Sequence, residues 1–352
     1  MSVNIIVGDA RKKMKELPDC SVQMCCTSPP YFGLRDYGMD GQIGLEDTPD
    51  AFVARLVEVF REVRRVLRDD GTLWLNLGDS YAGGGHGGGG SFSGERRSYR
   101  EKRGATRRLH GGGAKPKDLI GIPWMVAFAL RADGWYLRQE IIWHKPNPMP
   151  ESVQDRCTKA HEQVFLLAKS PRYFFDAAAI AEDSCAKGER PQRRRAEALA
   201  AQHGLTDAHI AALRACSIGD AGKAQATQSG YGRNDPAVQA LADEAKAALG
   251  GYTREFLILA TRNRRSVWSV STQPFTGAHF ATMPPALADL CIRAGSRPGD
   301  MVLDPFGGAG TTGLVADRLQ RQATLIELNP TYAAIARERI MAEAGLFAGA
   351  AE

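Results

Sequence analysis

Long apolar runs are absent from this 352-residue sequence, and none approaches the roughly 18 to 20 residues that a membrane-spanning helix needs. Cysteine is scarce: there are seven, an odd number, and no Cys-x-x-Cys pair occurs. A disulfide framework or a metal site is therefore not expected. The first residues show no charged-then-apolar signal pattern. These absences lead us to expect a cytoplasmic protein with no membrane partner.

Positive charge is concentrated in one segment. The whole chain carries a net charge of +5, but residues 94–117 alone hold nine Lys/Arg against two Glu. This segment follows the run GGGHGGGG at 83–90, which cannot hold regular structure at a reasonable entropic cost. We therefore expect a flexible basic loop over 83–117, which suits a polyanionic partner. On charge alone, a solvated loop without a ligand is as good an interpretation.

Hydrophobic periodicity predicts strands that alternate with helices, which indicates a parallel α/β sheet. Asp9 is expected to cap the first helix, and Thr48 or Asp50 to begin the second. The residues HEQVFLLAKSPRYFFD at 161–176 predict a strand, a turn and a second strand. The expected strands lie within 3–9, 21–26, 72–80, 135–148, 161–176, 255–270, 300–306 and 322–329, and the expected helices within 10–18, 48–71, 118–134, 284–295, 310–320 and 330–345.

The composition changes between residues 182 and about 252, which are rich in Ala, Arg, Gln and Gly. Residues 196–215 read as a helix, a glycine turn and a second helix. This pattern is compatible with a DNA-binding helix-turn-helix, but we favour an ordinary helical hairpin.

A glycine-rich loop follows the strand predicted at 300–306 and opens the next helix. Gly307, Gly308 and Gly310 let the backbone turn tightly and approach a ligand closely. Glu327 ends the next strand, where a carboxylate is well placed for ribose hydroxyls. The spacing fits neither a dinucleotide fingerprint nor a phosphate loop. The stretch from Asp304 to Gly310 resembles the S-adenosylmethionine loop of Rossmann-like methyltransferases, whose pattern is Asp-x-Phe-x-Gly-x-Gly.

A Ser-Pro-Pro-Tyr stretch stands at the end of the second predicted strand, at residues 28–31. The hydroxyl of Ser28 and the carbonyl of Pro29 can accept hydrogen bonds from the N–H groups of an exocyclic amine. The lone pair of such an amine is delocalised into its ring, and these hydrogen bonds would free it for attack. Pro29 and Pro30 fix φ and remove competing donors, and Tyr31 offers a face for a flipped base. Alone, the stretch is as well explained as a rigid turn. Together with the glycine loop it resembles the catalytic motif of the DNA amino-methyltransferases, (Asp/Asn/Ser)-Pro-Pro-(Tyr/Phe). The resemblance implies an active site that acts by positioning the substrate and by hydrogen bonding to it.

The motif order is similar to that of the beta class of this family, in which the catalytic loop comes first. The resemblance covers roughly residues 1–181 and 255–345. It implies a Rossmann-like, doubly wound, mostly parallel sheet of the class I methyltransferase type with permuted motif order. Residues 1–181 would form the catalytic half, 182–265 an inserted, mainly helical target-recognition region, and 266–352 the S-adenosylmethionine-binding half. The cofactor-binding residues implied by the match are Asp9, His279, Phe280, Met283, Asp304, Pro305, Phe306, Gly307, Gly308, Gly310, Thr311, Thr312, Glu327 and Asn329.

The same resemblance implies methylation of a flipped base in double-stranded DNA of the nucleoid. Ser28 favours cytosine N4, and adenine N6 remains the alternative. Cytosine C5 is excluded, because its chemistry needs a cysteine nucleophile, usually after a proline, and no Pro-Cys pair occurs. RNA and protein amino-methyltransferases are less favoured. A homodimer and a cognate restriction endonuclease are left open. The residues expected to contact DNA are Arg96, Arg97, Arg103, Arg107, Arg108, Lys145, Arg262, Arg264 and Arg265, although Lys145 is as well explained as a surface lysine.

Overall fold

The computed structural model describes residues 2–34, 36–82, 114–183, 198–217, 236–250, 261–273 and 283–348. The chain divides into two compact units, residues 181–264 and the remainder. The bounds of the strands are β1 Val3–Val7, β2 Val22–Thr27, β3 Leu67–Leu77, β4 Tyr136–His144, β5 His161–Ala168, β6 Glu182–Asp183, β7 Thr261–Arg262, β8 Val267–Ser269, β9 Met301–Asp304 and β10 Gln322–Glu327. The bounds of the helices are α1 Ala10–Lys13, α2 Pro49–Val66, α4 Ile122–Ala132, α6 Asp207–Ser217, α7 Pro236–Leu249, α8 Pro285–Gly295, α9 Thr311–Arg318 and α10 Pro330–Ala348.

The larger unit is built on an eight-stranded sheet in the order β1-β10-β9-β2-β3-β5-β4-β8. The first five strands in this order are parallel to one another. β5 pairs antiparallel with both β3 and β4, and β4 pairs parallel with β8. Only β5 therefore runs against the rest of this sheet, and the expected doubly wound, mostly parallel sheet is confirmed.

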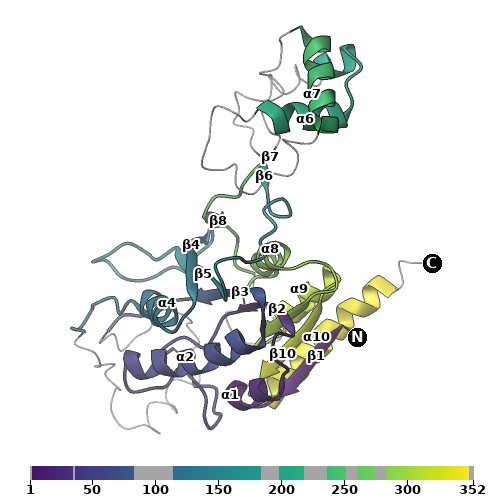
Figure 1. The fold of residues 1–352 in the computed structure, drawn as a ribbon. Coiled ribbons are helices and arrows are strands. Elements are labelled where there is room, and N and C mark those ends of the chain that lie inside the picture. Colours follow the sequence, from purple (N-terminus) through teal and green to yellow (C-terminus); the bar gives the residue numbers. More distant parts are fainter. Residues whose placement is uncertain are drawn as a thin grey trace. The chain divides into compact units, whose positions relative to one another are not determined.

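Helices cover both faces of this sheet (Figure 1). On one face α2 and α4 pack over a core that includes Phe60, Leu73 and Phe165. On the other face α8 and α9 pack over Met24 and Trp74. Alternate residues of one strand serve the two faces, as the side-chain period of two requires, since Cys25 belongs to the first core and Met24 to the second. β2 is buried along its whole length, which is typical of a strand covered by helices on both sides.

Two predicted helix caps are confirmed. The Asp9 side chain accepts the backbone N–H of Arg11 at 2.9 Å, and the Thr48 hydroxyl accepts that of Ala51 at 3.1 Å. One predicted element is wrong: residues 173–176 form no strand. The backbone there makes single bonds to separate elements, from Phe174 N to Asp70 O and from Asp176 N to Ala294 O. The aromatic run that suggested a strand instead packs on the sheet, where Phe175 stacks on Trp74 at 6.2 Å.

The smaller unit is mainly helical in its described part. A helix at 198–202 and α6 are separated by a turn at Gly204, whose φ is +62°, and α6 and α7 pack together. A small core holds Ala200, Leu213, Ala245 and Leu249. β6 and β7 form a two-stranded antiparallel ribbon. The role of this unit in target recognition stays a prediction.

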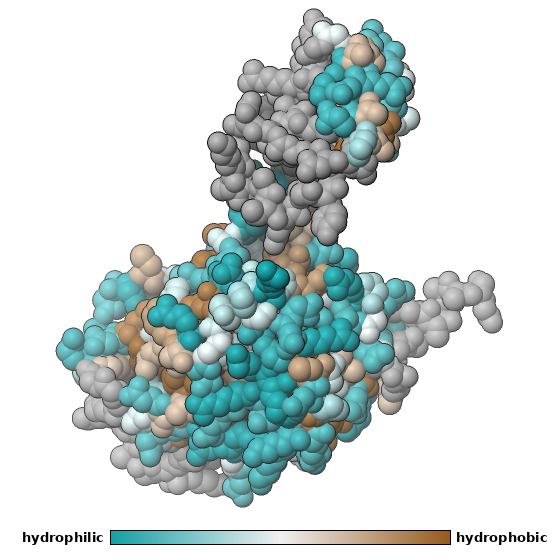
Figure 2. Space-filling model, viewed as in Figure 1, coloured by the Kyte–Doolittle hydropathy of each residue, from teal (hydrophilic) through white to brown (hydrophobic). Residues whose placement is uncertain are grey.

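The surface of the larger unit is mostly hydrophilic in the view of Figure 2, with apolar patches near α4. Two large apolar side chains of α4, Trp124 and Phe128, are exposed and lie one helical turn apart. Among the described residues, no helix is both long and apolar enough to cross a membrane.

Candidate functional site

The Ser-Pro-Pro-Tyr turn begins where β2 ends. Thr27, the last residue of β2, is fully buried, and Ser28 is the first residue of the turn that is partly accessible. The Thr27 hydroxyl donates to Asp304 Oδ1 at 2.6 Å, which ties the end of β2 to the end of β9. The turn is thereby held against a loop that lies almost three hundred residues later in the sequence.

Asp304 organises the start of the glycine loop. Besides Thr27, its carboxylate accepts the Thr312 hydroxyl at 2.8 Å and the backbone N–H of Phe306 at 3.0 Å. The Thr312 hydroxyl also lies 3.2 Å from the carbonyl of Cys26. Burial raises the pKa of Asp304, while these hydrogen bonds favour its ionised form. The residue is only 4% exposed, so the main contacts of its carboxylate are with the protein itself.

Glu327 fixes the other side of the glycine loop. Its Oε2 accepts the backbone N–H of Gly308 at 2.8 Å, and its Oε1 accepts that of Asn329 at 2.8 Å. Because a carboxylate offers about four acceptor sites, these bonds leave it capacity for a further donor. Burial raises the pKa of Glu327, and the backbone N–H groups of Asn329 and Gly308 oppose that rise.

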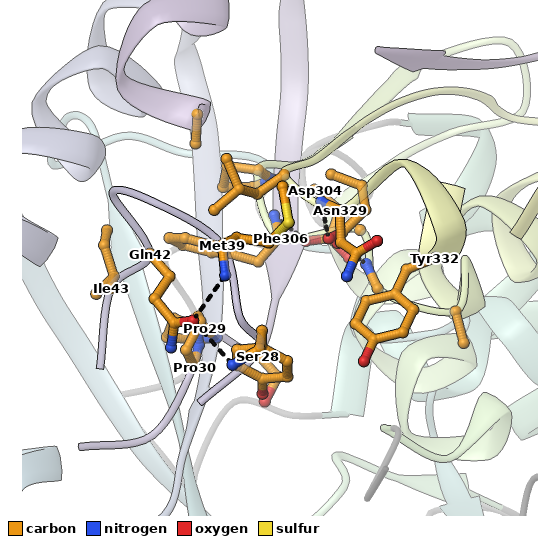
Figure 3. Close-up of a pocket in the computed structure, with 18 of the residues that line it drawn as sticks. Ser28, Pro29, Pro30, Met39, Gln42, Ile43, Asp304, Phe306, Asn329 and Tyr332 are labelled. Carbon is orange, nitrogen blue, oxygen red and sulfur yellow. Dashed lines mark hydrogen bonds between the residues drawn. The ribbon is translucent and has the colours of Figure 1, made fainter. Parts of the chain in front are cut away.

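Both motifs line one cavity of about 190 Å³. In Figure 3, Ser28, Pro29 and Pro30 lie on one side, and Asp304, Asn329 and Tyr332 on the other. The structure therefore brings together the turn and the loop that the sequence analysis assigned to one site. The predicted residues on the wall of this cavity are Asp9, Ser28, Pro29, Pro30, Tyr31, Met283, Asp304, Pro305, Phe306, Gly307, Gly308, Thr311, Thr312, Glu327 and Asn329.

Gly310 is a predicted site residue that does not line the cavity. Its φ is +77°, and a Cβ at this position would lie 2.9 Å from the Cβ of Ala336 on α10. Glycine is therefore required here by the backbone turn and by close helix packing. Its effect on the site is to set the path of the loop.

The segment after the turn supplies cavity walls that the sequence analysis missed. Leu34, Tyr37, Met39, Gln42 and Ile43 all line the cavity. The side chain of Gln42 accepts the backbone N–H of Tyr37 at 2.8 Å and that of Met39 at 3.4 Å, which folds the segment onto itself. The glycines at 33, 38, 41 and 44 have positive φ and were the available signal for a shaped loop. Further lining residues not predicted are Gly8, Ala10, Gly41, Ala309, Leu328 and Tyr332.

Tyr31 is held from two sides. Its ring lies so close to Gly78 that a Cβ there would approach Tyr31 Cε2 to 2.4 Å. Its hydroxyl donates to Glu162 Oε2 at 2.7 Å and lies 3.4 Å from Asn76 Oδ1. Burial, followed by the charge of Glu162, raises the pKa of Tyr31 well above its usual value, so the phenol keeps its proton. Glu162 was not predicted from the sequence.

Several other polar residues have partners within their own compact unit. Asp79 accepts the backbone N–H groups of Gly121 and Ile122 at 3.0 Å and so caps α4. Lys145 pairs with Glu162 and lies 4.5 Å from the centre of the Trp143 ring. Arg262 pairs with Glu182 at 3.0 Å across the β6–β7 ribbon. Of the other predicted site residues, Arg264 is partly exposed and Arg265 is exposed. Seven more lie outside the described residues: His279, Phe280, Arg96, Arg97, Arg103, Arg107 and Arg108.

No group of three or more His, Cys, Asp or Glu is placed to hold a metal ion within the described ranges. Five cysteines whose side chains the structure describes are free thiols: Cys20, Cys25, Cys26, Cys157 and Cys291.

Comparison with known proteins identifies the family. Residues 22–338 match the N6/N4 methyltransferase family, which is described as DNA methylase. The chain is 41% identical to the Type II methyltransferase M.SmaI of Serratia marcescens over 97% of this chain and 91% of that protein. It is also 41% identical to the Type II methyltransferase M.Cfr9I of Citrobacter freundii, over 96% and 87% of the two chains.

Solved structures share the fold. The PvuII DNA methyltransferase, described as cytosine-N4-specific, superposes with a TM-score of 0.55 at 17% identity and covers 96% of this chain and 88% of its own. TTHA0409 of Thermus thermophilus, solved with S-adenosyl-L-methionine, gives a TM-score of 0.52 at 22% identity over 97% and 93%. From the family match and the full-length relatives, this chain belongs to the N6/N4 family of DNA methylases, enzymes that use S-adenosylmethionine to methylate an exocyclic amino group in DNA.

Proposed function

We propose that this enzyme is a site-specific methyltransferase that modifies the N4 amino group of cytosine in double-stranded DNA. The observation that carries the proposal is the cavity shared by the Ser28 turn and the Asp304–Glu327 loop. Serine at the first motif position is typical of the cytosine-N4 members of the family, whereas aspartate is typical of the adenine-N6 members. Adenine N6 is the second candidate, because a serine hydroxyl accepts equally well from either amine.

In this proposal, the turn positions the target base. The Ser28 hydroxyl and the Pro29 carbonyl accept the two amine N–H groups, which frees the nitrogen lone pair from the ring. Pro30 keeps these acceptors in place by restricting the backbone. The ring of Tyr31 provides an aromatic surface for the flipped base. The protein accelerates the reaction by orientation and hydrogen bonding rather than by a covalent intermediate.

The other wall of the cavity fits S-adenosylmethionine. Glu327 carries unused lone pairs for ribose hydroxyls, and both of its oxygens are fixed by backbone N–H groups. The side chains of Met283, Phe306 and Tyr332 add apolar surface for the cofactor's less polar parts. When bound, the cofactor supplies a methyl group on a sulfonium. Asp9 and Asn329 stand at the same wall, while Asp304 and Gly310 shape the loop from within.

The DNA surface is proposed to combine two basic regions. The arginines within 94–117 would contact phosphates, and residues 182–265 would read the sequence, with Arg264 and Arg265 as candidates there. We propose the nucleoid as the place of action. As the relatives are named Type II methyltransferases, a cognate restriction endonuclease is a further proposed partner, and a homodimer is a proposed assembly.

The decisive test is nucleoside analysis of duplex DNA after incubation with purified protein and labelled S-adenosylmethionine. N4-methylcytosine is the expected product, and N6-methyladenine would establish the second candidate instead. Ser28→Ala is expected to lose most of the transfer and to keep cofactor binding. Labelling of RNA or protein with none in DNA would overturn the proposal. Methylation-sensitive sequencing of the same DNA then gives the recognised site.

A further inference from the structure

A chain of polar groups leads from the cavity to β5. The Ser28 hydroxyl lies 3.5 Å from the Tyr31 oxygen, and the Tyr31 hydroxyl lies 2.7 Å from Glu162 Oε2. Glu162 Oε1 pairs with the ammonium of Lys145. The side chains of Lys145 and Glu162 are only 18% and 15% exposed, so this pair is largely shielded from water.

The partners of Glu162 fix the direction of the first hydrogen bond. An ionised carboxylate accepts hydrogen bonds and cannot donate them. One oxygen of Glu162 contacts the ammonium of Lys145, which has donors only. On the other oxygen, Glu162 accepts the Asn76 amide N–H at 3.1 Å as well as the Tyr31 hydroxyl. The Tyr31 proton therefore points toward Glu162.

Asn76 offers Tyr31 no donor. Its amide nitrogen donates to Glu162 Oε2 and to the carbonyl of Gln163 at 3.2 Å, which uses both of its N–H bonds. Its Oδ1 is the atom that faces the Tyr31 oxygen, at 3.4 Å. The side of Tyr31 that faces the sheet thus presents acceptors, and the lone pairs of the Tyr31 oxygen are left for the Ser28 hydroxyl.

We propose that Glu162 is a positioning residue that sets the direction of this hydrogen-bond chain and so makes Ser28 an acceptor toward the cavity. A serine hydroxyl can donate or accept, and rotates to suit its neighbours. Because the Ser28 hydroxyl donates its hydrogen bond to the Tyr31 oxygen, it can only accept hydrogen bonds from the substrate. The site then selects a group that donates hydrogen bonds, which an exocyclic amine does and a ring carbonyl does not. This inference rests on the proposed role of Ser28.

The proposal makes Glu162→Gln an informative variant. Glutamine keeps the size of the side chain, but its amide can donate to the Tyr31 oxygen and allow Tyr31 to donate to Ser28. We expect the single-turnover rate of DNA methylation, at saturating DNA and S-adenosylmethionine, to fall about tenfold, the worth of one hydrogen bond. Affinity for S-adenosylmethionine is expected to stay unchanged, because Glu162 does not line the cavity. Glu338→Gln, on the exposed surface of α10, makes the same chemical change and is expected to keep the wild-type rate.

A double-variant cycle separates this role from a merely structural one. Tyr31→Phe removes the hydroxyl through which Glu162 acts, and it is also expected to lower the rate about tenfold. Adding Glu162→Gln to Tyr31→Phe should then cause no further loss. The inference is overturned if the two losses multiply, or if either single variant keeps the wild-type rate. Should Glu162→Gln not fold, Tyr31→Phe alone decides. Failure of the proposed function is a different result, since the wild-type enzyme would then not methylate cytosine or adenine in DNA.

Discussion

Replacing Gly78 by alanine is expected to impair catalysis while the protein stays folded. Gly78 follows β3 and faces the ring of Tyr31. A Cβ at this position would lie 2.4 Å from Tyr31 Cε2, 2.9 Å from Cδ2 and 3.1 Å from Cζ. Non-bonded carbons prefer separations of about 3.5 Å or more, so the ring has to move by about 1 Å.

The expected size of the effect comes from the hydrogen bond that this movement breaks. The Tyr31 hydroxyl donates to Glu162 at 2.7 Å, and a displacement of about 1 Å takes the two oxygens out of hydrogen-bonding range. A hydrogen bond to a charged group is worth about 1.5–3 kcal/mol. If this loss falls on the transition state, the rate decreases by about 10- to 100-fold.

The assay is single-turnover methylation of duplex DNA with labelled S-adenosylmethionine, together with calorimetry of cofactor binding. Gly295→Ala is a matched control, because its Cβ would lie 2.7 Å from Trp74 Nε1 and 3.0 Å from Met24 Sδ, in the core. This control is expected to lower the melting temperature and to keep the rate per folded molecule. A Gly78→Ala enzyme with normal cofactor binding and the wild-type rate would refute the reasoning, since the position of Tyr31 would then not limit the reaction.

Three further predictions concern the cofactor, stability and DNA. Glu327→Gln is expected to weaken S-adenosylmethionine binding by about tenfold or more, because ribose hydroxyls would then meet no charged acceptor; unchanged affinity in calorimetry would remove Glu327 from that role. Because burial raises the pKa of Asp304, its carboxyl contributes stability below its usual pKa of 3.8, and this contribution disappears as the pH rises through the raised value. Asparagine does not titrate, so the stability advantage of the wild type over Asp304→Asn should decrease as the pH rises over that range. Urea unfolding of both proteins measures this advantage, and an increase with pH would contradict the prediction. The third change replaces five arginines by glutamine: Arg96, Arg97, Arg103, Arg107 and Arg108. The slope of log K against log[salt] for DNA binding should then decrease in magnitude by about 0.9 for each phosphate that is no longer neutralised. An unchanged slope in anisotropy titrations would show that these arginines neutralise no phosphates.

The sheet and most of the cavity could be predicted from the sequence because their signals are local. A buried strand followed by a rigid turn or a glycine loop is visible in a few consecutive residues, as for β2 with Ser28 and for β9 with Gly308. In a mostly parallel sheet such turns share one edge, so residues far apart in sequence are expected to meet. The caps at Asp9 and Thr48 were equally local.

The parts that the sequence did not reveal depend on contacts between distant segments. The wall formed by Tyr37, Met39 and Gln42 belongs to a loop without regular periodicity, and its shape depends on hydrogen bonds from one side chain to the backbone. The prediction of a strand at 173–176 was wrong for a similar reason. Aromatic residues are enriched in strands, but these pack their rings on Trp74 and on neighbouring side chains while the backbone joins no ladder.

Glu162 was missed because β5 runs against the other strands. The rule for parallel sheets directs attention to residues at the carboxyl ends of strands, and β2, β3, β4 and β9 obey it with Ser28, Gly78, Lys145 and Pro305. The register pairs Leu77, the last residue of β3, with Gln163, so the beginning of β5 lies at the same edge. An antiparallel strand therefore delivers its first residues where its neighbours deliver their last. Glu162, the second residue of β5, reaches the active-site edge for this reason, and in any sheet with one reversed strand the start of that strand belongs in the search for functional residues.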